Sequence, residues 1–127
     1  RIASDINKVI IQNVIDKKAK TIATLKEIAA NAREMRRALL DADFAYFCEL
    51  INSEWQLRKS LHPKVTMPEI EHEIDFALSH GAAAAKVCGA GGGGCILFYA
   101  KNKYAAAKKF KKVINFHFDK RGLHVWT

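Results

Sequence analysis

The sequence predicts an α+β domain with a helical first half and antiparallel strands in its second half. Up to Gly81, hydrophobic residues recur at the three- and four-residue spacing of amphipathic helices. Beyond Gly81 the pattern changes to short apolar runs and to alternation, which are typical of strands. Five of the seven glycines lie within positions 89–94, between two apolar runs. We therefore expect one domain with a hairpin around this glycine-rich loop.

The first forty positions predict two consecutive helices. Ser4 and Asp5 are residue types that cap helix N-termini, and we expect them to cap the first helix. A second helix, rich in Ala, Lys, Arg and Glu, follows it. Residues 16–20 contain neither glycine nor proline, so the boundary between the two helices is left open.

Two further helices follow, with clearer boundary signals. Asp43 is the predicted N-cap of the third helix, and the His-Pro pair at 62–63 ends it because the residue before proline avoids the helical region. The fourth helix begins after Thr66 or Met67, with a proline in its first turn. Gly81 is the predicted C-terminal cap of that helix.

The second half predicts two strands at 84–88 and 95–99, on either side of the glycine-rich loop. Residues 104–113 fit an amphipathic helix. The alternating apolar and polar residues at 114–119 and 123–126 predict two more strands.

The glycine-rich loop predicts a close backbone approach, to a phosphate or to another loop that holds one. Glycine is required where φ is positive or where two backbones meet, and successive bare N–H groups attract anions. The run lacks the Gly-Lys-Ser/Thr ending of a P-loop, and Cys95 begins an apparent strand rather than the helix of a dinucleotide-binding turn. The alternative is a glycine-rich hairpin that binds no ligand.

Composition favours anionic partners. The net charge is +8 with an isoelectric point near 9.5, which suits phosphorylated ligands or nucleic acid as binding partners. The alternative is that the basic residues only form solvated helix faces and bind no anion. No apolar stretch reaches the roughly 18 residues of a membrane span, and no signal peptide is visible. Because the chain begins at Arg1 rather than Met, we expect a piece of a longer protein.

The cysteines and histidines predict no metal site. Cys48, Cys88 and Cys95 are odd in number and lack metal-ligand spacing, which favours a reduced, cytoplasmic protein. Cys88 and Cys95 flank the glycine-rich loop; a disulfide and two free thiols are both open, and we favour free thiols. The histidines are scattered, and no Ser/His/Asp or Cys/His triad is present.

Three residues near the end of the third helix form a second candidate group. Trp55, Arg58 and Lys59 precede the break at 62–63. Basic side chains at this end complement the helix dipole, so a structural role and a substrate-facing role are both open.

Residues 86–95 (KVCGAGGGGC) resemble the third, C-terminal motif of the GHMP small-molecule kinases, which include galactokinase, homoserine kinase and mevalonate kinase. Residues 65–70 resemble the start of the helix that precedes this motif in galactokinases and mevalonate kinases. Residues 50–61 resemble the corresponding helix of the heptose-phosphate kinase branch. The resemblance extends over essentially the whole chain.

This resemblance implies that residues 1–127 are the ferredoxin-like C-terminal domain of a two-domain, ATP-dependent sugar kinase. The ATP phosphates, the Mg²⁺-binding acid and the catalytic Asp would then belong mainly to an N-terminal domain outside this chain, so no catalytic residue is assigned here. The implied supports of the phosphate-binding loop are Gly89, Ala90, Gly91, Gly92, Gly93 and Gly94. The substrate-side candidates are Trp55, Arg58, Lys59 and Lys86.

The function that we expect is phosphorylation of a heptose phosphate or a related sugar by the full-length cytoplasmic protein. The alternative is a non-catalytic ferredoxin-like module that binds nucleic acid or a small anion. The strand predicted at 84–88 has no aromatic residue, and the one at 95–99 is not an RNA-binding motif, so we expect no nucleic-acid partner.

The expected partners are a sugar or sugar-phosphate substrate and the N-terminal kinase domain of the same protein. A ferredoxin-like domain normally begins with a strand, whereas residues 1–39 are predicted to be helical. We therefore expect that strand upstream of this chain, and we expect the chain to self-associate where the rest of the protein is absent.

Overall fold

The computed structural model describes residues 2–89, 91–123 and 125–126. It confirms the α+β class, with its helices first and an antiparallel hairpin after them. The elements, in chain order, are α1 (Ile2–Ile15), α2 (Ala19–Leu40), α3 (Phe44–Leu61), the 3₁₀ turn η1 (Pro63–Val65), α4 (Pro68–Ser79), β1 (Ala82–Val87), β2 (Ile96–Ala100) and α5 (Lys103–Ala107).

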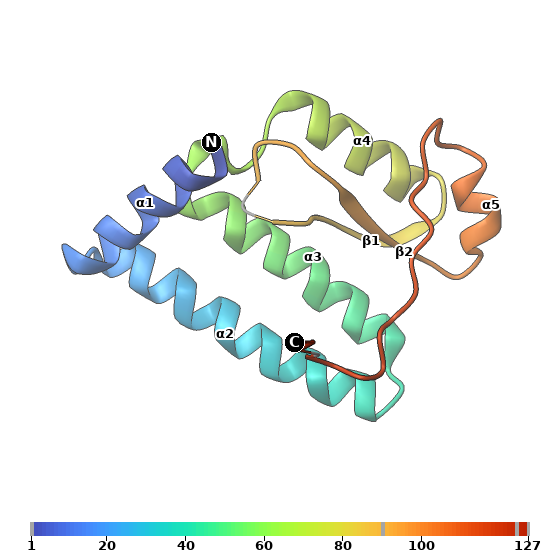
Figure 1. Cartoon of the computed structure of the whole chain (residues 1–127), viewed down its shortest axis with the longest axis horizontal. Helices are drawn as coiled ribbons and strands as arrows, with labels where there is room; N and C mark the ends of the chain where they lie inside the picture. Colours follow the sequence, from blue (N-terminus) through green and yellow to red (C-terminus); the bar gives the residue numbers. More distant parts are fainter. Residues whose placement is uncertain (1, 90, 124, 127) are drawn as a thin grey trace.

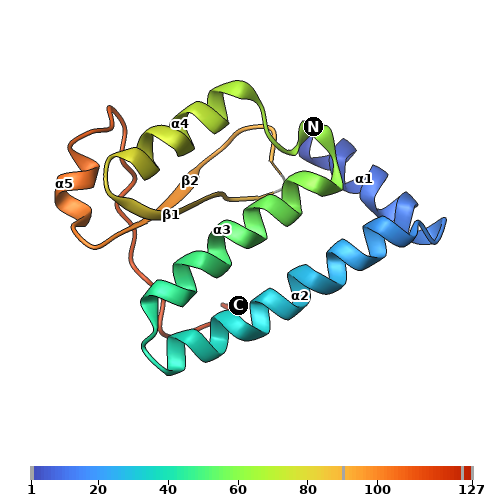
Figure 2. The same ribbon diagram turned by 180° about the vertical axis from the view of Figure 1, so that it is seen from behind.

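Helix α3 lies at the centre of the molecule. It packs against α2 on one side and against β1 on the other, and α4 also packs on β1 (Figure 1). Figure 2 shows the same arrangement from behind, with α2 and α3 forming a long antiparallel pair. The main core cluster lies where α1, α3, η1, α4 and β1 meet, and it contains Ile6, Trp55, Val65, Ile70, Ile74, Ala85 and Val87.

Several predicted boundary signals have the expected geometry. Asp43 Oδ1 accepts a hydrogen bond from the backbone N–H of Tyr46 at 3.0 Å and so caps α3. Helix α3 ends at Leu61, directly before the His-Pro pair at 62–63. Gly81 follows α4 with a φ of +99°, as a C-terminal glycine cap requires.

The start of the chain corrects one prediction. Helix α1 already begins at Ile2, so Ser4 and Asp5 lie within its first turn instead of capping it. The boundary that the sequence left open is a tight turn after Ile15, in which Lys17 has a φ of +53°. A positive φ is uncommon for a non-glycine residue, and the sequence carries no marker for it here.

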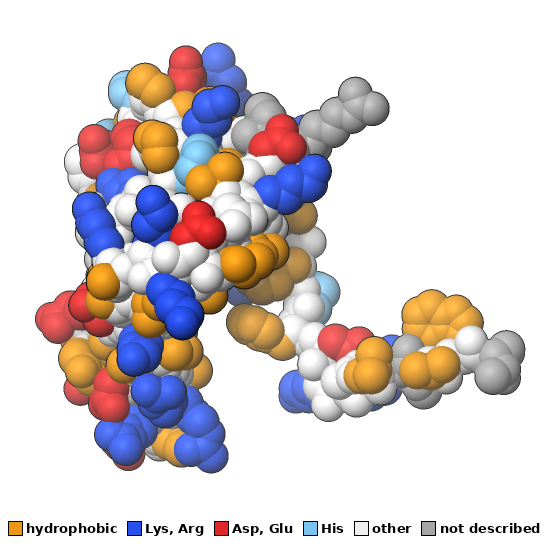
Figure 3. Space-filling model, turned by 90° about the vertical axis from the view of Figure 1, so that its left-hand side faces the viewer, with side chains coloured by type: hydrophobic (Ala, Val, Ile, Leu, Met, Phe, Trp, Pro, Cys, Tyr) orange, Lys and Arg blue, Asp and Glu red, His pale blue; other side chains and the backbone are white. Residues whose placement is uncertain are grey.

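The end of the chain corrects the remaining element predictions. Helix α5 ends at Ala107 rather than at 113, and neither 114–119 nor 123–126 pairs into a strand within the described residues. The alternation of apolar and polar residues gives these segments an apolar face, but a strand also needs a neighbouring strand with which to form hydrogen bonds. Phe118 is 86% exposed and Leu123 is 94% exposed. Figure 3 shows a narrow arm with hydrophobic side chains projecting from the body of the molecule.

The hairpin has one capped edge. In its register Val87 lies opposite Ile96, and the Ala83 carbonyl and the Ala85 N–H lie on the edge of β1 that faces away from β2. The side chain of Asn52 on α3 forms hydrogen bonds with both of these backbone groups. Its Nδ2 donates to Ala83 O at 3.0 Å, and its Oδ1 accepts from Ala85 N at 3.2 Å. Asn52 thus replaces a neighbouring strand.

We predict that Asn52→Ala lowers the free energy of unfolding by about 1–3 kcal/mol, because it leaves a partly buried donor and acceptor without partners. Urea denaturation followed by circular dichroism measures the change. Gln56→Ala is the control, since Gln56 is exposed on the same helix. Equal stabilities of the two variants would contradict the edge-capping role.

Candidate functional site

The glycine-rich loop joins the ends of β1 and β2. Within the described part of the loop, each of its glycines has a positive φ, from +73° at Gly92 to +134° at Gly93. L-amino acids with a Cβ rarely adopt such backbone angles. Ala90, which the sequence also assigned to the loop, lies outside the described residues. The run of glycines is therefore required by the path of the chain.

The first half of the loop packs against the 3₁₀ turn η1. The N–H of Gly92 donates to the carbonyl of Val65 at 3.0 Å. A Cβ added at Gly91 would lie 2.1 Å from that same oxygen. Two backbones thus meet where no side chain fits. The sequence predicted a close approach to a phosphate or to a loop that holds one, and that prediction stays untested.

The second half of the loop is open. Gly93 and Gly94 are exposed, and their N–H groups donate no hydrogen bond to any described residue. An added Cβ at Gly93 would meet nothing within 4 Å. These two amides are available to an anion, because backbone N–H groups are strong donors that require a partner once water is removed.

A buried carboxylate holds two basic side chains at the start of the loop. Glu54 on α3 is 5% exposed. Its Oε1 accepts from Arg58 Nε at 2.9 Å, and its Oε2 accepts from Lys86 Nζ at 2.5 Å. Arg58 also extends to the loop, with Nη1 3.5 Å from the carbonyl oxygen of Gly89. One carboxylate between two cations leaves a net charge of +1 beside the loop.

A second ion pair connects the end of α3 to the start of α4. Lys59 Nζ lies 2.7 Å from Glu71 Oε2, and Thr66 Oγ1 donates to Glu71 Oε1 at 2.6 Å. Lys59 also lies 5.8 Å from the centre of the Trp55 ring. These contacts fix the two helices that flank η1, and η1 in turn holds the glycine-rich loop.

The environment of Glu71 lowers its pKa. Burial alone would raise it, but the hydrogen bonds from Lys59 and Thr66 and the charge of Lys59 outweigh the burial. The Trp55 indole also favours the ionised carboxylate, although its buried Nε1 forms no hydrogen bond of ordinary length with the described residues. Glu71 is therefore an ionised anchor for Lys59.

The structure brings together only some of the residues that the sequence singled out. Arg58 and Lys86 lie side by side at the start of the loop, both bound to Glu54. Lys59 belongs to the neighbouring ion pair. Trp55 is 2% exposed and belongs to the core.

Sequence reasoning missed the residues that hold this arrangement. Glu54 precedes Arg58 by four positions, a spacing at which oppositely charged residues on a helix pair, so this contact was visible in the sequence. The contact of Gly91 with Val65 joins positions far apart in the chain, and no local pattern reveals it.

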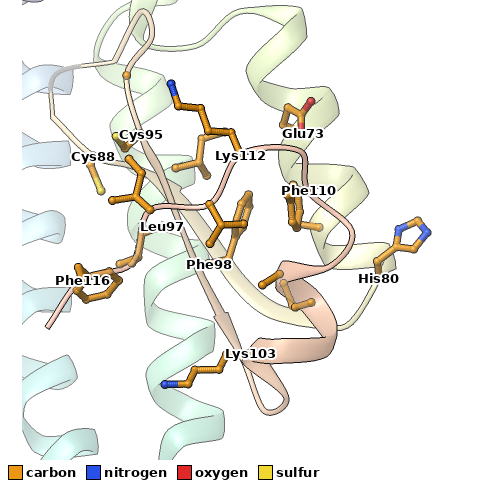
Figure 4. Close-up of a pocket in the computed structure, with 18 residues that line it drawn as sticks. Glu73, His80, Cys88, Cys95, Leu97, Phe98, Lys103, Phe110, Lys112 and Phe116 are labelled. Atoms are coloured by element: carbon orange, nitrogen blue, oxygen red, sulfur yellow. The ribbon is translucent and has the colours of Figure 1, made fainter.

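An apolar cleft of about 550 Å³ lies beside the outer edge of β2. Its walls come from α4, β2, α5 and the extended segment 112–116 (Figure 4). Leu97 and Phe116 also line a smaller cavity of about 280 Å³, whose lining includes Ile51 on α3 and Ala84 on β1.

The described residues offer no metal centre, since they contain no group of three or more His, Cys, Asp and Glu side chains in a ligating arrangement. All three cysteines are free, as the sequence analysis favoured. Among the described helices, none is both long enough and apolar enough to cross a membrane.

Comparison with known proteins gives two kinds of match. The family described as GHMP kinases C terminal matches residues 35–120. The chain is 30% identical over 113 residues to D-glycero-alpha-D-manno-heptose 7-phosphate kinase of Campylobacter jejuni subsp. jejuni, an alignment that covers 84% of this chain and 33% of that relative. It is 32% identical over 84 residues to L-fucokinase/L-fucose-1-P guanylyltransferase of Bacteroides fragilis, covering 66% of this chain and 9% of that relative. The chain thus spans only a minor part of each relative.

We predict that Gly91→Ala destabilises the domain more than Gly94→Ala does. Both residues have a φ near +100°, so both variants carry the cost of a strained backbone, about 1–3 kcal/mol. Only at Gly91 does the new Cβ also meet the backbone of Val65, whereas at Gly94 its nearest contact is an ordinary 3.8 Å. Urea unfolding of the two variants measures the difference. Equal losses would show that the loop does not rest on η1.

We also predict that Glu71 stabilises the fold in a pH-dependent way. The folded-state pKa lies below the ordinary Glu value of 4.5 that applies to the unfolded chain. The stabilisation is therefore fully present above the unfolded-state value and is lost as the pH falls through the folded-state value. The stability difference between the wild type and Glu71→Gln should be positive at about pH 7 and shrink by about pH 3. A difference independent of pH would contradict the ion-pair role.

Proposed function

Because this chain belongs to the family of GHMP kinase C-terminal domains, we propose that it is the C-terminal domain of an ATP-dependent sugar kinase. The substrate that we propose is a heptose phosphate or a related sugar, in line with the name of the Campylobacter relative. The observation that carries the proposal is the glycine-rich loop, held on η1, with two amides that have no partner among the described residues and a net positive charge beside it.

This geometry suits the chemistry of phosphoryl transfer. That reaction depends on positioning and on stabilising charge spread over phosphoryl oxygens. The N–H groups of Gly93 and Gly94 are backbone dipoles on a loop whose first half is held on η1, and such groups are most effective where charge develops. Arg58 and Lys86 add positive charge at the same end of the hairpin, with their positions set by Glu54.

The described residues fit the phosphates of ATP but not a Mg²⁺ ion. Backbone amides and basic side chains are donors that phosphates accept from. Mg²⁺ prefers carboxylate oxygens, and the described residues provide no acidic cluster for it. ATP would supply the phosphoryl group, while the rest of the protein would supply the Mg²⁺ ligands and the catalytic acid or base. We propose a cytoplasmic location, which suits the three free cysteines.

The proposed partner is the N-terminal domain of the same protein, and the apolar cleft beside β2 is its proposed contact. The outer edge of β2 faces the cleft, whereas the outer edge of β1 is capped by Asn52. The extended segment 112–116 on the far wall has no strand partner among the described residues. An extended strand from the remainder of the polypeptide would bond with both walls. The Campylobacter relative is long enough to contain such a strand outside the aligned region.

We predict that this chain alone transfers no phosphate, whereas a full-length protein containing it phosphorylates heptose 7-phosphate with ATP. A coupled assay of ADP release with a panel of sugars and sugar phosphates measures both. The isolated chain lacks the proposed Mg²⁺ ligands and catalytic residue, so its rate should equal the buffer rate.

Two outcomes would contradict the kinase proposal. One is robust turnover by the isolated chain, and the other is a folded full-length protein that phosphorylates no sugar in the panel. Binding of single-stranded RNA by such an inactive protein would favour the module alternative, which the net charge of +8 supports.

We predict that the isolated chain self-associates through its open cleft. Light scattering at increasing concentration should show a mass above that of one chain. Leu97→Lys should restore the monomer, because Leu97 faces both cavities on β2. Leu40→Lys is the control, since Leu40 is an exposed leucine on α2 that lines neither cavity. A clean monomer of the unmodified chain at high concentration would contradict the open-edge argument.

A further inference from the structure

Two free cysteines lie opposite each other where the hairpin enters the glycine-rich loop. The register that pairs Val87 with Ile96 places Cys88 opposite Cys95 as the next pair. The N–H of Cys88 donates to the carbonyl of Cys95 at 2.8 Å, so the pairing continues to this position. Both side chains are exposed, and both line the cleft at its loop end (Figure 4).

This placement meets the Cα requirement of a disulfide and comes within about 1 Å of its Cβ requirement. Residues that form a hydrogen-bonded antiparallel pair have Cα atoms about 5.5 Å apart, within the range of about 4.4–6.8 Å found for disulfides. Residues directly opposite each other project to the same face of a sheet, and in a hydrogen-bonded pair their Cβ atoms lie at the wider end of about 4.5–5.5 Å. A disulfide needs about 3.5–4.5 Å. A small movement of the strand ends closes this gap, and the flanking glycines permit it.

We propose that Cys88 and Cys95 are an oxidation site, and that they form a reversible disulfide by exchange with a low-molecular-weight disulfide such as oxidised glutathione. One cysteine thiolate attacks a sulfur of the reagent, forming a mixed disulfide and releasing one glutathione thiolate. The second cysteine thiolate then attacks the protein sulfur of that mixed disulfide and releases the other glutathione. Two protein thiols are oxidised, and one glutathione disulfide is reduced to two thiols.

The bond would fix the spacing between the two ends of the loop. The disulfide would close a covalent ring that includes the six residues 89–94. Gly93 and Gly94, with their open amides, would be members of this ring. This inference does not rest on the kinase function, because it uses only the register, the exposure and the state of the two thiols.

The third cysteine provides an internal control. Cys48 is buried on α3 beside Ile51 and Ala84. Burial raises the pKa of its thiol, which lowers the fraction of reactive thiolate. Cys48 is therefore expected to remain reduced under conditions that oxidise the pair.

The test is incubation of the folded 127-residue chain with oxidised glutathione, followed by alkylation, trypsin digestion and mass spectrometry. Cleavage after Lys86 and Lys101 leaves both cysteines in the peptide 87–101. We expect this peptide to lose two hydrogens and its reactivity toward iodoacetamide, and dithiothreitol to restore both. The peptide 38–58, which contains Cys48, should be alkylated throughout.

Single cysteine variants show whether Cys88 and Cys95 react as a pair or as two independent thiols. Cys88→Ser and Cys95→Ser should each retain one glutathione adduct on the remaining cysteine, because no second thiol resolves it. Cys48→Ser should form the disulfide as the unmodified chain does. The inference would be overturned by two stable glutathione adducts on peptide 87–101, by disulfides between chains, or by failure of that peptide to react at all.

Discussion

The contact between the backbone of the glycine-rich loop and the carbonyl of Val65 is the constraint on which the site depends. Val65 ends η1, a turn that exists because the His-Pro pair at 62–63 stops α3. Gly91 and Gly92 meet this turn at a distance that excludes a side chain. The position of the loop therefore follows from where α3 ends and α4 begins, and the ion pair of Lys59 with Glu71 fixes that junction.

The charged groups around the loop follow from the burial of Glu54. A buried carboxylate is costly unless it is paired, and removing one partner leaves an uncompensated charge. Arg58 and Lys86 satisfy its two oxygens separately. In return, the carboxylate restricts two long side chains that would otherwise sample many rotamers. The positive charge beside the loop is thus held in place before any ligand arrives, which is the property that electrostatic stabilisation of a phosphoryl group requires.

Local signals in the sequence predicted the features of the fold that depend on a few neighbouring residues. The cap at Asp43, the stop at 62–63 and the hairpin around the glycines all follow from preferences of a few neighbouring residues. The contacts of Asn52 with β1 and of Gly91 with Val65 depend on where α3 lies in space, so no local pattern reveals them. The strand predicted at 114–119 was wrong for a related reason, while the one predicted at 123–126 includes position 124, which lies outside the described residues. Alternation specifies an apolar face, but a strand also needs a neighbouring strand, and the described residues provide none.

The absence of a Cβ has different consequences in the two halves of the glycine-rich loop. At Gly91 it permits docking onto η1, which gives the loop a fixed base. At Gly93 it leaves an open backbone whose N–H group has no partner among the described residues. A loop that was flexible throughout would have to order itself around an anion, at a cost of about 1–2 kcal/mol for each residue fixed. Because its first half is already held, only the second half would have to order itself around a bound anion. The glycine content of this loop is therefore better explained by rigidity at one end than by mobility along its length.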